Sequence, residues 1–127
     1  MNKTIIKTDK APLPSGTYSQ AIKAGELLFV SGQLPIDPST GEIISDEATA
    51  QLRQCFKNIQ HICEEAGTSL DNAVKINIYY TDPNVSDVIN SVMAELFQEP
   101  YPARIRLKVA GLSKNAKVEM DGIFVCH

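Results

Sequence analysis

Two runs near the C-terminal end of the 127-residue sequence place arginines and carboxylates where they could act together. Polar and apolar side chains alternate over residues 103–109, which puts Arg104 and Arg106 on one side of a predicted strand. The same alternation over residues 117–125 predicts a second strand, with Glu119 on its charged side. If the two strands pair antiparallel, we expect their charged sides to lie on one face of the sheet.

An arginine beside a carboxylate can bind a small anion and transfer a proton. The planar guanidinium of Arg104 suits a carboxylate ligand, because it can donate two parallel hydrogen bonds. The carboxylate of Glu119 suits proton transfer to or from a bound molecule. The two side chains could equally form a plain cross-strand salt bridge, which is the more common outcome for two isolated strands. The residues alone leave both interpretations open.

Hydrophobic periodicity predicts the elements that must position these side chains. Apolar or alternating runs predict three further strands, at residues 20–24, 27–31 and 73–80, and a weak alternation at residues 4–8 could add a short strand before them. Together with two helices, the order is β-β-α-β-α-β-β, which predicts an α+β fold with both helices on one face of a mixed sheet. The other face of the sheet would be exposed in a monomer unless self-association covers it.

Both helices are predicted from apolar residues at helical spacing. The first ends at Ala66, because Gly67 is suited to the left-handed position that terminates a helix. The second ends near Phe97. The predicted N-terminal caps are Ser45 or Asp46 for the first helix and Asn84 or Ser86 for the second.

Composition excludes several classes of protein. A chain of 127 residues with 43% hydrophobic content predicts one globular domain over residues 1–127. The formal charge of −3 argues against a general nucleic-acid surface, and no apolar run is long enough to cross a membrane. Residues 1–10 carry lysines and an aspartate, and they do not read as a secretory signal.

The cysteines and histidines predict neither disulfides nor a metal centre. The sequence has three cysteines, an odd number without CxxC spacing: Cys55, Cys63 and Cys126. This favours reduced thiols packed as small apolar groups in a cytoplasmic protein. His61, within a helical pattern, and His127 are the only histidines, so we expect no metal site.

Three residues in the N-terminal third are further candidates for a binding site. Tyr18 follows a loop rich in proline and glycine, and a tyrosine there usually covers the edge of a core. Ser31 offers a hydroxyl, and Gly32 would let a ligand or another backbone approach closely. A bulge at the end of a strand explains Gly32 equally well.

Three motifs, in order along most of the chain, resemble those of one protein family. They are GTYSQA at residues 16–21, FVSGQLPIDPSTGEI at residues 29–43, and PAR followed by VAGLSKNAKVE at residues 102–119. They resemble the signatures of the RidA/YjgF/UK114 family. The resemblance implies a chorismate-mutase-like fold and a homotrimer whose clefts lie between subunits, which agrees with the expected uncovered sheet face.

The resemblance also implies an activity that needs no cofactor. Family members that carry this arginine hydrolyse reactive 2-enamine and 2-imino acids, such as 2-aminoacrylate, 2-iminopropanoate and 2-iminobutanoate, to 2-oxo acids and ammonia. By resemblance, Arg104 binds the substrate carboxylate and Glu119 handles the attacking water. The substrate-binding residues implied in this way are Tyr18, Ser31, Gly32, Arg104, Ile105 and Arg106.

The sequence departs from the family pattern at two places. Arg106 stands where many relatives carry a small residue, commonly cysteine. We hypothesise that Arg106 either neutralises Glu119 or Asp121, or admits a substrate with a second acidic group. The link between residues 97 and 102 is shorter than is typical of the deaminases, so the resemblance leaves the substrate range open.

Two opposing effects would act on the protonation of Glu119. A nearby Arg104 would lower the pKa of Glu119, whereas burial against the strands would raise it. The sequence does not rank the two effects.

Two other functions compete with the deaminase. In the first, a non-catalytic trimer binds a small carboxylate through Arg104 and regulates a partner; the presence of Glu119 favours the enzyme, because a binder needs the arginine alone. In the second, the protein cleaves RNA or inhibits translation. The acidic charge and the absence of a histidine pair near the site weigh against that second function.

Overall fold

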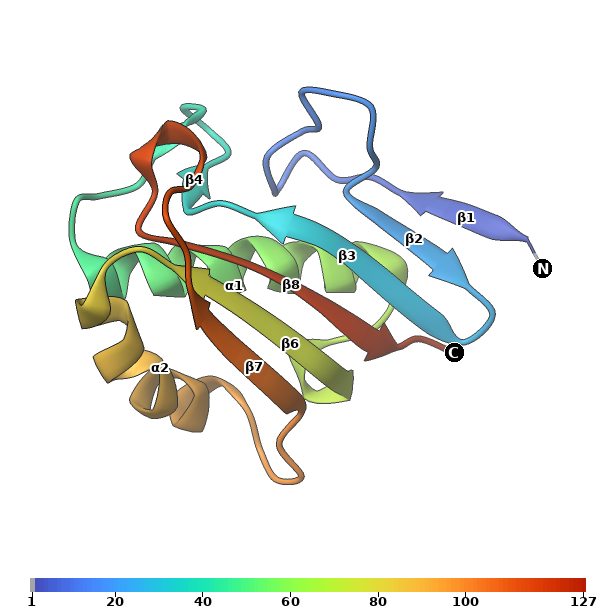
Figure 1. Cartoon of the computed structure of the whole chain (residues 1–127). Coiled ribbons are helices and arrows are strands. Elements are labelled where there is room, and N and C mark those ends of the chain that lie inside the picture. Colours follow the sequence, from blue (N-terminus) through green and yellow to red (C-terminus); the bar gives the residue numbers. More distant parts are fainter. Residues whose placement is uncertain (1) are drawn as a thin grey trace.

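The computed structural model describes residues 2–127 (Figure 1). The strands of its main sheet are β1 (Lys3–Ile6), β2 (Ala21–Ala24), β3 (Leu27–Gln33), β6 (Ala73–Tyr80), β7 (Ala103–Lys108) and β8 (Val118–Val125). The helices are α1 (Ala48–Ala66) and α2 (Pro83–Leu96). The strands lie in the order β1-β2-β3-β8-β6-β7, and both helices cover one face of the sheet. The predicted α+β fold is confirmed.

One helix end is confirmed, but both predicted N-terminal caps are wrong. Gly67 ends α1 in the left-handed conformation, with φ of 85°. The residue before α1 is Glu47, which makes no side-chain cap. The predicted cap Ser45 accepts a hydrogen bond from the Glu47 amide before the helix begins. Asp82 caps α2 by accepting from the Asn84 amide at 2.9 Å. Pro83 follows it as the first helical residue, where its fixed φ is favourable.

The hydrophobic core lies between the sheet and the helices. Alternate residues of β3, β6 and β8 point into it and meet the apolar stripes of α1 and α2. Phe56 of α1 packs edge-to-face against Phe97, with ring centroids 5.6 Å apart. The main fully buried side chains are Leu28, Leu52, Phe56, Ile59, Ile76, Ile78, Ile89, Met120 and Phe124.

The predicted pairing between residues 103–109 and 117–125 is wrong. Strand β6 lies between β7 and β8; it pairs parallel with β7 and antiparallel with β8. Helix α2 connects β6 to β7, and a helical crossover returns the chain to the end from which it started, so the two strands run parallel.

This topology separates the two charged sides. Arg104 lies beside Ile76, which is buried under the helices, whereas Glu119 lies beside Tyr79 on the opposite face. The expectation that Arg104 and Glu119 share one face of the sheet is therefore wrong within a single chain.

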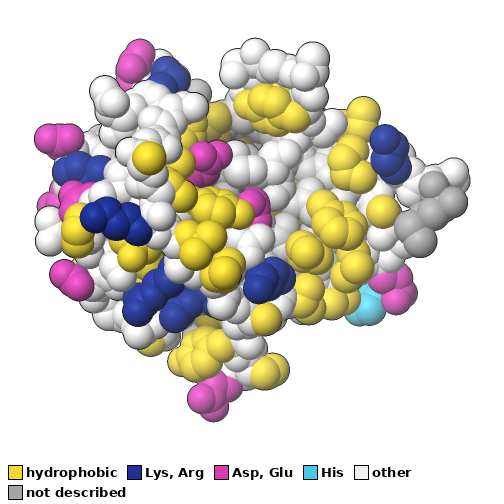
Figure 2. Space-filling model, viewed as in Figure 1, with side chains coloured by type: hydrophobic (Ala, Val, Ile, Leu, Met, Phe, Trp, Pro, Cys, Tyr) yellow, Lys and Arg dark blue, Asp and Glu magenta, His cyan; other side chains and the backbone are white. Residues whose placement is uncertain are grey.

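The face of the sheet without helices is exposed in the single chain, as expected from the number of helices. Large apolar side chains lie on it, including Phe29 of β3 and Ile105 and Leu107 of β7, which are 43%, 43% and 46% exposed. Figure 2 shows hydrophobic side chains spread across this face of the molecule. We call it the open face.

A small hairpin follows β3 and was not predicted as strand. It consists of β4 (Ile36–Asp37) and β5 (Glu42–Ile43), joined by the predicted turn, in which Gly41 has φ of 77°. Residues of this hairpin form one wall of the candidate site described below.

The three cysteines are free and buried, as their interpretation as apolar packing groups predicts. Burial, with smaller contributions from Cys126 and Glu64, raises the pKa of Cys63 to about 12, so this thiol stays protonated at neutral pH. Over residues 2–127, neither α1 nor α2 is both long and apolar enough to span a bilayer.

Candidate active site

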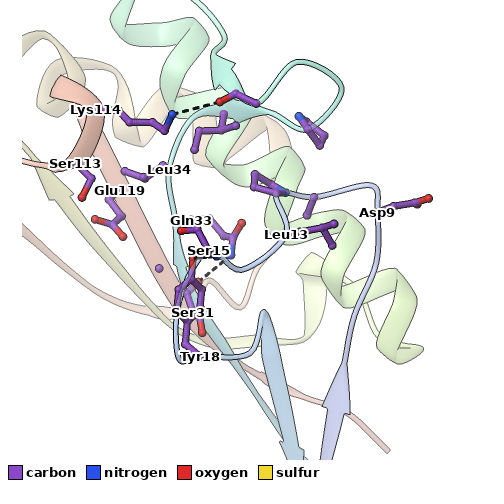
Figure 3. Close-up of a pocket in the computed structure, with 16 residues that line it drawn as sticks. Asp9, Leu13, Ser15, Tyr18, Ser31, Gln33, Leu34, Ser113, Lys114 and Glu119 are labelled. Atoms are coloured by element: carbon purple, nitrogen blue, oxygen red, sulfur yellow. Dashed lines mark hydrogen bonds between the residues drawn. The ribbon is translucent and has the colours of Figure 1, made fainter.

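A cleft of about 860 Å³ opens at the end of β3, beside the middle of the sheet (Figure 3). The loop before β2, the β4–β5 hairpin and the turn around Lys114 form its walls. Four of the predicted site residues line it: Tyr18, Ser31, Gly32 and Glu119. We call it the Glu119 cleft.

Gly32 makes room for the carboxylate of Glu119. A Cβ atom built on Gly32 would overlap Oε2 of Glu119 and lie 3.2 Å from its Cδ. The pairing of β3 with β8 also shifts register between Val30 and Gln33 at this point. The register shift confirms the predicted bulge. The group that comes close to Gly32 is a side chain of the neighbouring strand, not a backbone, and approach of a ligand stays a prediction.

The Ser31 hydroxyl ties β3 to the loop that carries Tyr18. It donates a 2.5 Å hydrogen bond to the carbonyl of Ser19, and the Ser31 amide donates to the carbonyl of Gln20. The hydroxyl proton is thus used inside the chain. A ligand would meet the oxygen of Ser31 as an acceptor.

Buried amide side chains that the sequence reasoning missed hold the walls of the cleft. Gln20 accepts from the Thr8 amide at 2.7 Å and donates to the carbonyl of Pro12 at 2.9 Å, which fixes the loop before β2. Asn58 of α1 donates to the carbonyls of Leu34 and Ile36, which fixes the start of the β4–β5 hairpin. The sequence signal that could have identified them is a polar residue within an otherwise apolar pattern, because a buried polar side chain needs a hydrogen-bond partner.

Tyr18 forms an outer wall of the Glu119 cleft. Its hydroxyl accepts a hydrogen bond from the Ser15 amide at 3.3 Å, and its ring is half exposed. On the opposite side, the Lys114 ammonium donates to the carbonyl of Gly41, drawn as a dashed line in Figure 3.

Burial controls the protonation of Glu119. Burial, and then the negative charge of Asp121, raises the pKa of Glu119 above its usual value. Asp121 accepts hydrogen bonds from Asn77 at 2.6 Å and from the Tyr79 hydroxyl at 3.2 Å, which keep its carboxylate next to Glu119 on the open face. The guanidinium of Arg104 does not lower the pKa of Glu119 within one chain, because Arg104 lies on the other face of the sheet.

Arg104 borders a different hollow, of about 460 Å³, at the edge of the sheet beside α2. Its Nη1 donates to Oδ1 of Asn90 at 2.8 Å and contacts the sulfur of Met93 at 3.6 Å. Burial, and then the charge of Arg106, lowers the pKa of Arg104 from its usual value. We call this region the Arg104 hollow. The contacts of Arg104 with Asn90 and Met93 were not predicted from the sequence.

Arg106 also faces α2, where its Nη1 donates to the carbonyl of Ser86 at 3.0 Å. Because it points away from the open face, it does not neutralise Glu119 or Asp121 within one chain. Ile105 lies between the two arginines on β7 and points to the open face. One chain thus brings Tyr18, Ser31, Gly32 and Glu119 together and places Arg104 and Arg106 elsewhere.

Metal ligands are not grouped in the part of the chain that the structure describes. Within residues 2–127, no three His, Cys, Asp or Glu side chains are positioned to hold an ion. The chemistry of the Glu119 cleft is that of a partly buried carboxyl group with a raised pKa, a group suited to proton transfer.

Comparison with known proteins places these features in one family. Residues 8–126 match the family model described as Endoribonuclease L-PSP. The 2-iminobutanoate/2-iminopropanoate deaminase of Dermatophagoides farinae is 40% identical over 97% of this chain and 96% of its own length.

Two crystal structures extend the comparison to the fold. RidA from the Antarctic bacterium Psychrobacter sp. PAMC 21119 is 46% identical and superposes with a TM-score of 0.91, covering 96% of this chain and 98% of that one. Escherichia coli TdcF, solved with bound serine, is 34% identical with a TM-score of 0.87, covering 98% of this chain and 99% of that one.

Proposed function

The chain belongs to the RidA/YjgF/L-PSP family, and we propose on that premise that it hydrolyses 2-imino acids and their 2-enamine tautomers. The substrates would be 2-iminopropanoate, 2-iminobutanoate and 2-aminoacrylate, and the products 2-oxo acids and ammonia. One observation carries the proposal: the Glu119 carboxyl lies partly buried in an open cleft with a raised pKa.

Glu119 would move the protons of the reaction. Water adds to C2 of the imine while Glu119 accepts a proton from it, and the same carboxyl then returns the proton to the nitrogen. In the resulting carbinolamine, Glu119 takes the proton of the new hydroxyl group and passes it to the nitrogen; the C=O bond forms as the C–N bond breaks and ammonia leaves, so atoms balance without any redox change. A positioned carboxyl group of this kind accelerates a reaction by about 10²–10⁴-fold.

Arg104 would bind the substrate carboxylate, and a second subunit is needed to bring it to Glu119. Within one chain the two side chains lie on opposite faces of the sheet. We propose a homotrimer in which the open face is covered by neighbours, so that each cleft combines Glu119 of one subunit with Arg104 of the next. The exposed Phe29, Ile105 and Leu107 support this assembly, because large apolar groups gathered on one face favour a protein–protein contact.

The activity is tested by trapping the imine. A threonine dehydratase supplies 2-iminobutanoate, semicarbazide captures whatever remains free, and the rate of semicarbazone formation is followed. The wild-type protein should suppress the trapped product, and Arg104→Met should lose the suppression. Arg53→Met is a matched control, because Arg53 is an exposed arginine paired with Glu95 on the helix layer. A wild-type protein without any suppression would refute the proposed reaction.

The shared cleft is tested by mixing two inactive variants. Arg104→Met and Glu119→Gln subunits, unfolded and refolded together, would form some clefts that contain both native residues. Random assembly should restore about a quarter of the wild-type activity. If the two residues acted within one chain, the mixture would stay inactive.

A regulatory protein that binds a small carboxylate without catalysis is the second candidate. The serine in the TdcF structure supports it, since serine also carries a carboxylate. Calorimetry with 2-oxobutanoate separates the two: binding that depends on Arg104, without suppression of the trapped imine, would favour the regulatory function. Cleavage of RNA, which the family description names, would appear as degradation of a labelled RNA by the same preparation.

A further inference from the structure

We propose that Arg106 adapts the site to 2-imino dicarboxylates, with Arg104 binding the carboxylate next to the imine and Arg106 binding the distal one. The inference rests on the proposed hydrolysis and names its substrate class. The imines of aspartate and glutamate, iminosuccinate and 2-iminoglutarate, are the dicarboxylates of suitable length.

The two arginines form a pair on one side of β7. They are two residues apart in a strand, which places their Cα atoms about 6.6–6.8 Å apart on the same side. The charge of Arg106 contributes to lowering the pKa of Arg104, so the two guanidinium groups are close enough to repel each other. A ligand with two negative groups would relieve this repulsion.

Neither guanidinium has a carboxylate partner within residues 2–127. The acidic residues at the start of α2 are turned elsewhere: Asp82 pairs with Lys117 at 3.6 Å, and Asp87 lines a separate hollow with those two residues. Two adjacent exposed cations without an anion are unfavourable for the folded chain, which favours a ligand as the missing counter-charge.

Helix α2 holds each guanidinium through one nitrogen and a neutral acceptor. Arg104 donates to the side chain of Asn90, and Arg106 donates to the carbonyl of Ser86. A guanidinium has five N–H donors, so each arginine keeps enough of them for a two-point contact with a carboxylate. Ser86 lies in the first turn of α2, where the helix dipole disfavours a cation and favours an anion.

The reaction itself is unchanged. Water adds to C2, the C–N bond breaks, and iminosuccinate gives oxaloacetate and ammonia, while 2-iminoglutarate gives 2-oxoglutarate and ammonia. The substrate must come from an enzyme that oxidises an acidic amino acid to its imine and passes the electrons to its own acceptor.

The test compares two imines on the same variants. An aspartate oxidase supplies iminosuccinate, a threonine dehydratase supplies 2-iminobutanoate, and kcat/KM is measured for each by semicarbazide trapping. Arg106→Met should lower the ratio of kcat/KM for the dicarboxylic over the monocarboxylic imine by about tenfold, as expected for loss of about 1.4 kcal/mol. Arg106→Lys should restore part of the ratio, and Arg53→Met should leave it unchanged.

Binding gives a readout that does not depend on turnover. The dissociation constant of oxaloacetate should rise more in Arg106→Met than that of 2-oxobutanoate. Equal losses on both ligands, or an unchanged ratio of kcat/KM, would overturn the role of Arg106 and leave the proposed hydrolysis intact. A wild-type protein inactive on both imines would instead refute the proposed hydrolysis.

Discussion

The Glu119 cleft and the Arg104 hollow differ in how firmly a single chain builds them. Glu119 lies on β8, in the interior of the sheet, with Gly32 beneath its carboxylate and buried amides fixing the surrounding loops. Arg104 lies on β7, an edge strand, where every residue is exposed and a hydrogen bond to Asn90 and a contact with Met93 hold the guanidinium.

This difference indicates which half of the site is complete by itself. Glu119, the proposed proton-transferring group, is positioned by the core of its own chain, so its pKa is already raised there. Arg104, the proposed anion-binding group, lies at a sheet edge beside an apolar face, where another subunit could reach it. The four predictions below test this division.

Disrupting the open face should have the largest effect. Phe29→Asp combined with Leu107→Asp places charges on the apolar surface proposed to lie between subunits, where an unpaired charge is strongly unfavourable. We expect single chains in sedimentation analysis and loss of imine hydrolysis, although both halves of the site remain intact. Ile44→Asp, which alters an exposed apolar residue before α1, is the control and should keep the assembly. A monomer with full activity would show that the site is complete in one chain.

Filling the space under Glu119 should have the next largest effect. Gly32→Ala would push the carboxylate from its position, because the added Cβ overlaps Oε2. We expect kcat/KM to fall by about 10²-fold, within the range attributed to a positioned acid–base group. Gly111→Ala is the matched control, since a Cβ there meets nothing within 4 Å. Full activity in Gly32→Ala would show that catalysis does not depend on the position of the Glu119 carboxylate.

Removing the charge of Asp121 should shift the pH dependence. The Asp121 carboxylate contributes to raising the pKa of Glu119, so Asp121→Asn should lower that pKa. If Glu119 acts as a base, the acidic limb of the profile of kcat against pH should move to lower pH. Asp71→Asn, in the turn before β6, should leave the limb in place. A limb that moved to higher pH in Asp121→Asn would contradict the assigned role.

Neutralising Glu119 should have the smallest effect, and it concerns stability. Because burial raises the pKa of Glu119 in the folded chain, the unfolded chain ionises at lower pH, so ionisation opposes folding above the usual glutamate pKa and has no effect when the group is protonated in both states. Glu119→Gln should therefore raise the denaturant midpoint at about pH 7, and the gain should vanish at about pH 4. The measurement belongs in the Phe29→Asp, Leu107→Asp background, where no neighbouring Arg104 can offset the effect. A gain that persisted in acid would have a cause other than ionisation.

Local patterns predicted most of the elements. The strand over residues 73–80 and the end of α1 before Gly67 agree with the structure, since alternation and a left-handed glycine act within a few residues. The cap of α1 was wrong because the Ser45 hydroxyl binds the Glu47 amide before the helix begins. The cap of α2 was wrong because Asn84 and Ser86 have capping chemistry similar to that of Asp82, the residue that caps the helix. The β4–β5 hairpin was missed because two-residue strands carry too little alternation to detect.

Four residues of the candidate cleft were predictable from the sequence, but the placement of Arg104 and Glu119 on one face of the sheet was wrong. Glu119, Gly32, Ser31 and Tyr18 were all predicted, and all four line one cleft. Asn90, Ser86 and Gln20 were not predicted as positioning residues, because their contacts join segments at least eight residues apart. Tertiary packing determines which residues of such distant segments meet, and a local sequence pattern does not contain this information.

The sequence by itself determined which side chains share a side of each strand, because that follows from a repeat of two residues along the backbone. Arg104 and Arg106 therefore lie together on β7, and Glu119 lies with Asp121 on β8. Only the tertiary structure decided which face each pair occupies. Helix α2 returns the chain so that β7 runs parallel to β6, and β6 lies between β7 and β8. The arginines of β7 therefore face the helices, and the carboxylates of β8 face the open side.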